Sequence, residues 1–378
     1  MGKYIPVTLN NITALEFQSS LPQGKVALVC EGGGQRGIFT AGVLDEFMRS
    51  QFDPFDLLLG VSAGAQNLSA FACGQRGYAR RVINRYTTNN QFFNPIRFVR
   101  GGNLLDLDWY IETTSKEMPL NMPKALRRFD SGREFYMVAS RSDNFKANYF
   151  QPEKSTWLDI VKASSAIPAF YRNGVLFQDV VYHDGGISDA IPVKEAYRRG
   201  CRTIVVIRTV PSEYQYTTEW VDKMGKWFEN GRFQRFLNMA QVHIETYTDT
   251  LRFIQSPPED AVIIEIYPPT TLQSSALGSR LSALNHDYHV GRRCGRYFLA
   301  TIGQHFSKKK FQQHDKKIFS LFENEAKADK AEDAEIIQKG TRSVHPEVRS
   351  VQEGVDLLIR IVILIFPSFI TTLRIALL

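Results

Sequence analysis

Near its N-terminal end, the sequence twice places a short apolar run before a glycine-rich turn and a helical pattern. Residues 25–30, KVALVC, precede a glycine cluster and then IFTAGVLDEFMRS, in which Ile38, Val43 and Phe47 recur at helical spacing. Residues 55–59, FDLLL, precede GVSAG and then AQNLSAFACG, whose small residues suit a helix. A strand that enters a helix through a tight turn is the building unit of a parallel sheet. This repetition therefore constrains the fold more than any other feature.

Further runs of the same two kinds follow along the chain. Strands are expected at 134–140 and 202–210, and helices at LDIVKASS and PVKEAYRRG. Strands that alternate with helices predict an α/β fold with a mainly parallel sheet covered on both faces. With 378 residues, 43% of them hydrophobic and 22% charged, the chain can bury such a core.

Changes in sequence character predict four parts. Residues 1–24 form an N-terminal extension, and residues 25–212 form the α/β domain. Residues 213–323 are long, aromatic and helical in pattern, with AVIIEIYPP (261–269) as one strand that can join the sheet edge, so we expect a helical C-terminal appendage. Residues 324–378 combine a charged segment, expected to be flexible, with a hydrophobic tail.

The tail, LLIRIVILIFPSFITTLRIALL, is too interrupted for a membrane span. Arg360 and Arg374 leave 13 uncharged residues between them, and Pro367 lies among these; a span needs about 20. The tail is instead expected to contact a membrane surface or to pack against the protein, and an aberrant tail from a reading-frame change is a third option. The net charge of +7 favours anionic surfaces. Because the basic residues are scattered and no nucleic-acid-binding motif accompanies them, nucleic acid is not an expected partner.

Cysteine spacing and the N-terminus bear on the compartment. Cys30, Cys73, Cys201 and Cys294 show no CxxC spacing, and the N-terminus lacks the apolar run of a secretory signal. We therefore expect free thiols and a cytoplasmic location, with peripheral contact at the inner face of a membrane as a further option.

The segment GVSAG (60–64) fits the pattern GxSxG at a turn between a predicted strand and a predicted helix. Such a turn presents its serine outward, and Gly60 and Gly64 must lack side chains so that strand and helix can pack around it. Ser62 is therefore the candidate nucleophile. An incidental serine in a glycine-rich turn is the alternative, and the preceding strand FDLLL argues against it.

A second glycine motif, GGGQRG (32–37), also lies between a strand and a helix. Its N–H groups and the helix dipole can bind negative charge, as an oxyanion hole requires. The same GxGxxG spacing describes a dinucleotide site, which is the main alternative. A Rossmann unit should, however, carry an acidic residue at the end of its second strand, and GVSAG occupies that place.

The third motif is Asp184-Gly185-Gly186, within VVYHDGGISDAIP. Taken alone, DGG is most often a turn. An activated serine nevertheless needs a base within hydrogen-bonding reach, and a desolvated carboxylate can take the place of imidazole. Asp184 is thus a candidate base, and its glycines permit close approach. His183 is expected to point to the opposite side of an extended segment.

In this order, EGGGQRG, GVSAG and HDGG resemble the patatin-like phospholipase family, and ASSAIPAFY (163–171) and DAIPV (189–193) extend the likeness. The resemblance implies a three-layer α/β/α sandwich in which residues 25–212 are the catalytic domain. It also implies a Ser-Asp dyad without histidine. Carried over by motif, Ser62 is the nucleophile and Asp184 the base.

The resemblance also assigns a role to the glycine loop. N–H groups around Gly33 and Gly34 would form the oxyanion hole, and Arg36 stands where the family usually has Arg or Lys. The full set expected around the oxyanion is Gly32, Gly33, Gly34, Arg36 and Gly37.

The implied function is that of a serine lipid acyl hydrolase, either phospholipase A-like or a carboxylesterase. It would cleave phospholipids or other acyl esters through an acyl-enzyme, with no metal or organic cofactor. Two alternatives stay open: a catalytically silent nucleotide- or lipid-binding protein that uses the glycine loop, and an acyltransferase with the same dyad. A Ser-Asp-His hydrolase is the nearest enzymatic rival, because histidines follow Asp184 at His243, His286, His289, His305, His314 and His345.

Overall fold

In the described part of the chain, nine strands form one sheet. The computed structural model describes residues 2–9, 11–17, 20–168, 170–212 and 232–306. The strands are β1 (Lys3–Val7), β2 (Lys25–Cys30), β3 (Leu57–Val61), β4 (Glu134–Arg141), β5 (Ala147–Phe150), β6 (Val175–Phe177), β7 (Val180–Asp184), β8 (Cys201–Ile207) and β9 (Val262–Ile266). Their order is β1-β9-β8-β2-β3-β4-β7-β6, and β5 also pairs with β4.

Strand direction divides the sheet into two parts. Pairing is parallel from β1 through to β4, and β5, β7 and β6 add antiparallel strands at one end. The strands β2 and β3 are central neighbours, with Cys30 opposite Gly60. Because both strands end at the same edge, the glycine loop and the serine turn that follow them are brought side by side.

Helices fill most of the connections between strands. The α-helices are α1 (Thr13–Glu16), α2 (Gly37–Arg49), α3 (Ala63–Ala72), α4 (Tyr78–Val82), α5 (Pro95–Val99), α6 (Leu107–Glu117), α7 (Met122–Asp130), α8 (Trp157–Ser164), α9 (Val193–Arg198), α11 (Arg232–Gln255) and α12 (Leu281–Ala300). Short helical turns are η1 (Gly34–Arg36), η2 (Ile83–Thr87), η3 (Gly185–Ile187) and η4 (Ile302–His305).

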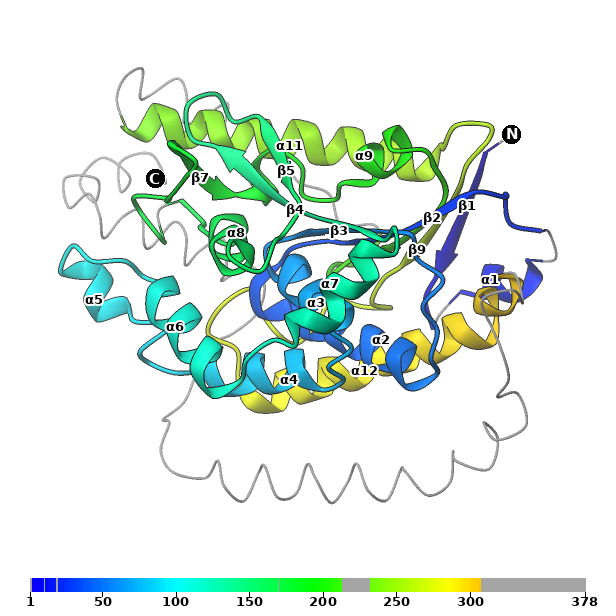
Figure 1. The fold of residues 1–378 in the computed structure, drawn as a ribbon, viewed down its shortest axis with the longest axis horizontal. Helices are drawn as coiled ribbons and strands as arrows, with labels where there is room; N and C mark the ends of the chain where they lie inside the picture. The colour runs from blue at the N-terminus through cyan, green and yellow to red at the C-terminus, as the bar shows by residue number, and fades with distance from the viewer. Residues whose placement is uncertain (1, 10, 18–19, 169, 213–231, 307–378) are drawn as a thin grey trace, which may run out of the picture. The chain divides into compact units, whose positions relative to one another are not determined.

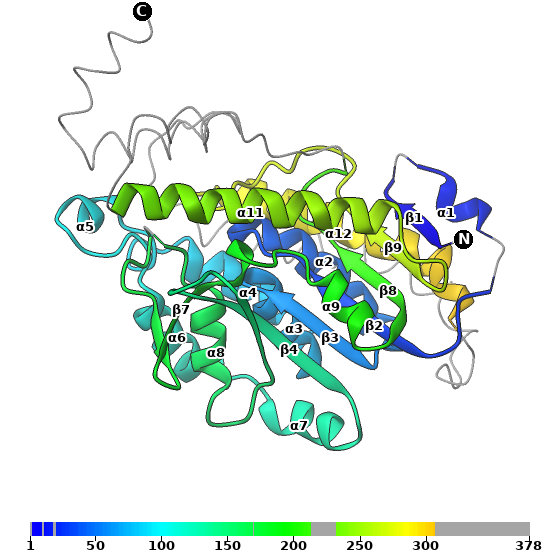
Figure 2. The same cartoon turned by 90° about the horizontal axis from the view of Figure 1, so that it is seen from above.

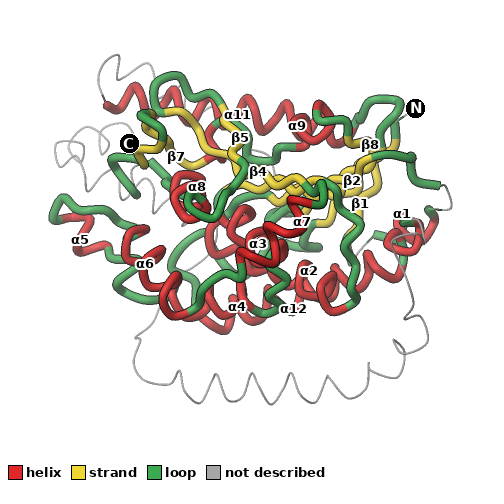
Figure 3. Tube along the Cα trace, in the orientation of Figure 1, coloured by secondary structure: helices red, strands yellow, loops and turns green. Residues whose placement is uncertain are grey.

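Alternate residues of the central strands face two different helical layers. Leu28 and Leu58 pack in one core with side chains of α2, α3 and α12. Val29 and Leu59 pack in a second core with side chains of α9 and α11. Figures 1 and 2 show the sheet between these two sets of helices, and Figure 3 shows the strands in yellow between helices in red. The expected α/β/α sandwich with a mainly parallel sheet is confirmed.

The helical C-terminal region is also present, and in its described part the helices α11 and α12 belong to the outer layers. Helix α11 covers one face of the sheet, and α12 packs beside α2 on the other. The strand expected at the sheet edge within 261–269 is β9, which lies one position inside that edge because β1 pairs with its outer side. The domain boundaries expected at residues 24, 212 and 323 stay predictions. One sheet contains strands from both sides of the first two boundaries, since β1 precedes residue 24 and β9 follows residue 212. The segment 324–378 lies outside the described residues.

Two further observations concern the cysteines and membrane-spanning helices. All four cysteines are buried and free. Between residues 2 and 306, apart from the gaps given above, no helix is both long enough and apolar enough to cross a membrane.

Candidate active site

Ser62 occupies the sharp turn between β3 and α3. Its backbone adopts φ 52° and ψ −122°, a conformation that L-residues rarely take. Its N–H donates to Ser164 Oγ at 2.9 Å, and its carbonyl accepts from the N–H of Gln66 at 3.1 Å. These bonds hold the turn in a strained form that presents the side chain at the end of the parallel strands.

The two glycines that flank Ser62 are required by packing. A Cβ on Gly60 would lie 2.7 Å from the Cα of Ala65, and a Cβ on Gly64 would lie 2.3 Å from the carbonyl oxygen of Cys30. Neither backbone atom has room to move, because β2, β3 and α3 meet here. The structure thus gives a physical reason for the GxSxG spacing.

Asp184 is the last residue of β7 and is held by its backbone on both sides. Its N–H donates to the carbonyl of Ala166 at 2.9 Å, and its carbonyl accepts from Ser140 Oγ at 2.8 Å. Gly185 follows with no room for a side chain, since a Cβ would lie 2.3 Å from the carbonyl oxygen of Val138. The turn therefore sets the carboxyl in one position.

The side chains of Ser62 and Asp184 meet. Ser62 is 6% exposed and Asp184 7% exposed, and the Ser62 hydroxyl lies close enough to the Asp184 carboxyl to lower its pKa. The N–H of Gly186 also donates to Asp184 Oδ1, at 2.8 Å. Burial raises the pKa of Asp184 to about 6, while the nearby Ser62 hydroxyl and the bond from the Gly186 N–H act to lower it. Such a carboxyl is ionised at neutral pH and is a stronger base than an exposed aspartate.

The glycine loop lies directly beside this pair. A Cβ on Gly32 would come within 3.2 Å of Ser62 Cβ. Gly33 and Gly34 have φ angles of 144° and 58°, which glycine adopts at little cost. In the described part of the chain, no acceptor is found for the N–H groups of these two residues.

The other two residues of the expected oxyanion set use their N–H groups inside the loop. The N–H of Arg36 donates to the carbonyl of Gly33 at 3.2 Å. The N–H of Gly37 donates to the carbonyls of Gln35 and Gly34. Their backbone donors are therefore engaged in shaping the turn, which narrows the candidate oxyanion donors to the preceding glycines.

An apolar pocket opens beside Ser62. Gly34, Gln35, Gln66 and Asn67 line it near the serine. Its deeper walls are apolar and come from α4, η2, α6 and the loops at 92–105 and 276–277, and they include Ala79, Val82, Ile83, Phe92, Leu105, Leu107 and Leu277. The pocket therefore offers a mostly apolar surface next to the Ser62 side chain.

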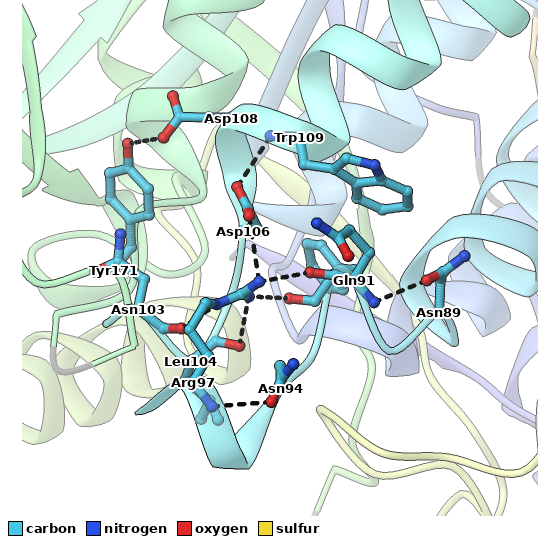
Figure 4. A network of polar contacts seen from close by, with 11 residues as sticks. Asn89, Gln91, Asn94, Arg97, Asn103, Leu104, Asp106, Asp108, Trp109 and Tyr171 are labelled. Atoms are coloured by element: carbon cyan, nitrogen blue, oxygen red, sulfur yellow. Dashed lines mark hydrogen bonds and ion pairs between the residues drawn. The ribbon is translucent and has the colours of Figure 1, made fainter. Parts of the chain in front are cut away.

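One wall of the pocket comes from Phe92, Leu105 and Leu107, at the base of the segment 92–107, here called the α5 hairpin. Phe93 pairs with Leu105 in an antiparallel bridge at its base. Figure 4 shows Arg97 at the centre of its polar contacts: the guanidinium donates to the carbonyls of Asn103 at 2.8 Å and Gln91 at 2.9 Å, and to Asp106 Oδ2 at 3.2 Å. These bonds fix the hairpin as a rigid part of the wall.

Each described histidine that follows Asp184 in the sequence has a partner of its own. His243 Nδ1 bonds the carbonyl of Gly186 at 2.5 Å, and His286 Nδ1 lies 3.0 Å from Asp287 Oδ1. His289 packs against the Tyr288 ring, and His305 packs edge-on against Phe17. His314 and His345 lie outside the described residues. No cluster of histidine, cysteine and acidic side chains suited to a metal ion is found among the residues that the structure describes.

Sequence reasoning missed several residues that hold this site. Ser164 belongs to the quoted segment ASSAIPAFY but received no role, and its hydroxyl anchors Ser62. Glu31 bonds the N–H of Thr209 at 2.6 Å, which fixes the start of the glycine loop. These contacts join segments far apart in the sequence, so local spacing gives no signal of them.

Comparisons with known proteins place the chain in a family. The model of the patatin-like phospholipase family matches residues 28–197, and a domain of unknown function, DUF6363, matches residues 233–307. The chain belongs to the patatin-like phospholipase family. It is 60% identical over 309 residues to the uncharacterized protein YjjU of Escherichia coli, covering 82% of this chain and 86% of that protein.

More distant matches include a named enzyme and a solved structure. Lysophospholipase NTE1 of Saccharomyces cerevisiae is 24% identical over 311 residues, which are 78% of this chain but only 18% of the yeast protein. The structure of human GIVD cytosolic phospholipase A2 is 10% identical, with a TM-score of 0.41, covering 80% of this chain and 62% of that one.

Proposed function

We propose that this protein is a serine hydrolase that cleaves acyl esters of lipids, with Ser62 as nucleophile and Asp184 as base. The observation that carries the proposal is that Ser62, on a strained turn, lies beside the buried Asp184 carboxyl, whose pKa is about 6 and is lowered by the Ser62 hydroxyl. Membership of the patatin-like phospholipase family supports lipid esters as the substrate class.

In the first half of the reaction, Asp184 accepts the Ser62 proton as Oγ attacks the ester carbonyl. The tetrahedral intermediate carries a negative oxygen, which the N–H groups of Gly33 and Gly34 stabilise. The intermediate collapses as the ester C–O bond breaks, and the leaving alcohol takes the proton from Asp184. An acyl-enzyme on Ser62 results.

In the second half, water replaces the alcohol. The water oxygen attacks the acyl carbonyl while Asp184 accepts a proton from the water. The N–H groups of Gly33 and Gly34 stabilise the second oxyanion. The intermediate then collapses, Ser62 recovers its proton from Asp184, and the fatty acid leaves. Only side chains and N–H groups of this chain take part, so the proposal requires no metal or organic cofactor.

The surroundings of the glycine loop favour a hydrolase over a nucleotide-binding protein. The N–H of Gln35 donates to the carbonyl of Ala276 at 2.9 Å, and a Cβ on Gly34 would lie 2.3 Å from that oxygen. A dinucleotide pyrophosphate would contact this part of the loop, but Ala276 covers it. The carbonyl of Ala276 also occupies the N–H of Gln35, which the pyrophosphate would otherwise use. An acyltransferase would use the same two residues and differ only in the final acceptor.

Location and membrane contact also belong to this proposal. Four buried free thiols support a reducing, cytoplasmic compartment. Peripheral contact with a membrane would bring the pocket to its substrate. The basic surface and the C-terminal tail were expected to provide it, and the tail lies outside the described residues.

The decisive experiment compares wild type with Ser62→Ala and Asp184→Ala on p-nitrophenyl esters and on phospholipids. Each substitution should reduce kcat by at least about 10³-fold without a change in fold. A fluorophosphonate probe should label wild type and should not label Ser62→Ala. Well-folded wild type that neither hydrolyses any ester nor reacts with the probe would instead favour a silent binding protein, and acyl transfer to an added alcohol would favour the transferase.

A further inference from the structure

Helix α11 contacts both loops of the candidate active site from one of its faces. His243 and Tyr247 are four residues apart and therefore lie one above the other. His243 Nδ1 donates to the carbonyl of Gly186, in the turn after Asp184, at 2.5 Å. The Tyr247 hydroxyl donates to Glu31 Oε1, at the start of the glycine loop, at 2.6 Å.

Burial and charge make the Tyr247 contact a strong one. Glu31 is 5% exposed, and its other carboxylate oxygen accepts from the N–H of Thr209 at 2.6 Å. Arg208 donates to the Tyr247 hydroxyl at 2.9 Å and to Glu265 Oε1 at 2.7 Å. The tyrosine thus links a buried cation to a buried anion, and loss of its hydroxyl removes one hydrogen-bond partner from each of them.

The His243 contact needs a proton on Nδ1, because a carbonyl oxygen can only accept. Burial lowers the pKa of His243, which keeps the ring neutral at pH 7. The donated bond fixes Gly186, whose own N–H holds Asp184 Oδ1 at 2.8 Å. A chain of two hydrogen bonds therefore connects α11 to the carboxyl.

We propose that α11 acts as a clamp that positions the two loops, His243 through Gly186 and Tyr247 through Glu31. This inference rests on the proposed function and gives a role to residues 233–307, the match to a domain of unknown function. His243 and Tyr247 are positioning residues, since neither touches Ser62 or the Asp184 carboxyl in the contacts described above. Their role is to hold the glycine donors and the carboxyl at a fixed separation.

The test uses the full-length chain with Tyr247→Phe, His243→Leu and His243→Asn. An asparagine can place its amide N–H where His243 Nδ1 donates. His243→Asn should therefore keep most of the kcat that is lost in His243→Leu. Tyr247→Phe and His243→Leu should each lower kcat about tenfold or more while KM changes less than twofold. Glu245→Gln, on an exposed position of α11 between them, is the matched control and should leave kcat unchanged.

A second measurement keeps the test independent of activity. Amide hydrogen exchange should speed up at residues 32–37 in Tyr247→Phe and at 184–187 in His243→Leu, with the rest of the sheet protected as in wild type. The clamp is refuted if neither exchange nor kcat changes in folded variants, or if asparagine rescues no better than leucine. If wild type has no esterase activity, the exchange result still decides the clamp, and only the proposed function fails.

A second and independent observation concerns the tip of the α5 hairpin. Helix α5 begins at Pro95 after Asn94, whose side chain accepts from the N–H of Arg97 at 2.9 Å. Ile96 is 65% exposed and Val99 69% exposed, and at a spacing of three they lie on one side of the helix. In Figures 1 and 2, α5 stands at the left end of the molecule, away from the sheet.

Charge at this tip has one sign. Residues 92–105 contain two arginines and no acidic residue. Arg100 is exposed, and so is Arg172, whose guanidinium lies 4.7 Å from the centre of the Phe98 ring. Two exposed apolar side chains beside two exposed cations match the interface of an anionic bilayer, where the apolar groups enter and the cations meet phosphates.

We infer that the α5 tip docks on an anionic phospholipid surface and so brings the pocket to it. The base of the same hairpin lines the pocket through Phe92, Leu105 and Leu107. The inference rests on the proposed function for its purpose, but lipid binding can be measured without catalysis. Ser62→Ala protein therefore serves as the background for binding experiments.

The test measures sedimentation with vesicles of phosphatidylcholine containing about 30% phosphatidylglycerol. Ile96→Ser/Val99→Ser should weaken binding about tenfold or more and leave hydrolysis of a soluble ester unchanged. Ile12→Ser/Leu15→Ser is the matched control, because that pair is also about three residues apart and is 64% and 61% exposed. Equal binding by both double variants, or equal binding to vesicles without phosphatidylglycerol, would overturn the inference. So would a change in oligomeric state alone, since it would assign the tip to a second copy of the chain.

Discussion

The backbone N–H of Ser62 donates to the hydroxyl of Ser164, at 2.9 Å, inside the protein. Ser164 is the last residue of α8 and is completely buried. The serine turn is therefore anchored to a helix that follows β5, well outside the strand–turn–helix unit that forms it. This bond also occupies the N–H of Ser62, so the oxyanion donors have to come from elsewhere.

Ser164→Ala should lower both stability and activity. It leaves a buried N–H without its acceptor, which costs about 1–3 kcal/mol of unfolding free energy, and the looser turn should lower kcat about tenfold. Ser69→Ala is a matched control, since Ser69 is a buried serine that accepts from Trp157 Nε1 at 3.0 Å. Urea denaturation should show a similar loss of unfolding free energy for both variants, whereas only Ser164→Ala should lower kcat.

The pH dependence of kcat/KM should show an acid limb near pH 6. The pKa of Asp184 is raised to about 6 by burial. Below that value the carboxyl is protonated and cannot accept the Ser62 proton, so kcat/KM should fall about tenfold for each pH unit and should level off above it. Burial also raises the pKa of Asp189 to about 6, and Asp189 bonds Tyr149 rather than Ser62. If the kcat/KM profile of Asp189→Asn still falls below about pH 6, the acid limb belongs to Asp184. If the acid limb is lost in Asp189→Asn, the proposed base is contradicted.

Gly64→Ala should prevent normal packing at the serine turn. Its Cβ would lie 2.3 Å from the carbonyl oxygen of Cys30, an overlap that backbone atoms cannot relieve locally. We expect a loss of about 3 kcal/mol or more in unfolding free energy, measured by urea denaturation. Gly303→Ala places its Cβ 3.4 Å from the nearest atom, so its stability should stay within about 1 kcal/mol of wild type.

Chain-length preference should depend on Ala79, which lines the pocket. Ala79→Leu adds three carbons to the pocket wall and should shift preference toward short acyl chains. We expect the ratio of kcat/KM for p-nitrophenyl octanoate to that for the butyrate to fall about tenfold. Ala300→Leu, at an exposed position at the end of α12, should not change the ratio. An unchanged ratio in Ala79→Leu would mean that the acyl chain binds elsewhere.

Arg208→Met should destabilise the sheet strongly. The Arg208–Glu265 pair joins the residue that follows β8 to β9 at 2.7 Å, with both side chains 1% exposed. Removing the cation leaves a buried carboxylate uncompensated, which costs about 3–5 kcal/mol. Arg252→Met breaks a pair with Asp249 whose side chains are 74% and 58% exposed, so its effect should stay within about 0.5 kcal/mol. Comparable urea midpoints for the two variants would contradict this reading.

Local sequence patterns predicted the central part of the fold. The strand at 25–30 is β2, and the run expected at 55–59 is β3, displaced to Leu57–Val61 because Gly60 pairs with Cys30 of β2 and Val61 pairs with Val138 of β4. Strand β1 was not expected. Pro6 interrupts its pattern, and proline is tolerated there because β1 is an edge strand whose partner, β9, lies some 260 residues later.

The site divides in the same way. Ser62 and its flanking glycines follow from a pattern of five adjacent residues, because the geometry of the turn is local. The contacts of Ser164, Tyr247 and His243 join elements that meet only in the folded chain, so residue spacing in the sequence does not predict them. Asp184 stands between these cases: its DGG turn is local, but its position opposite Ser62 depends on β7 pairing with β4.

The pairing of β1 with β9 has a consequence for synthesis on the ribosome. Strand β1 leaves the exit tunnel long before Val262–Ile266 has been translated, and β9 is its partner in the described sheet. At about 5–20 residues per second, the first strand waits tens of seconds or less with an unpaired edge. The sheet therefore cannot close on that side until nearly all of the described residues exist, which makes the nascent chain, rather than the finished protein, the form most in need of a chaperone.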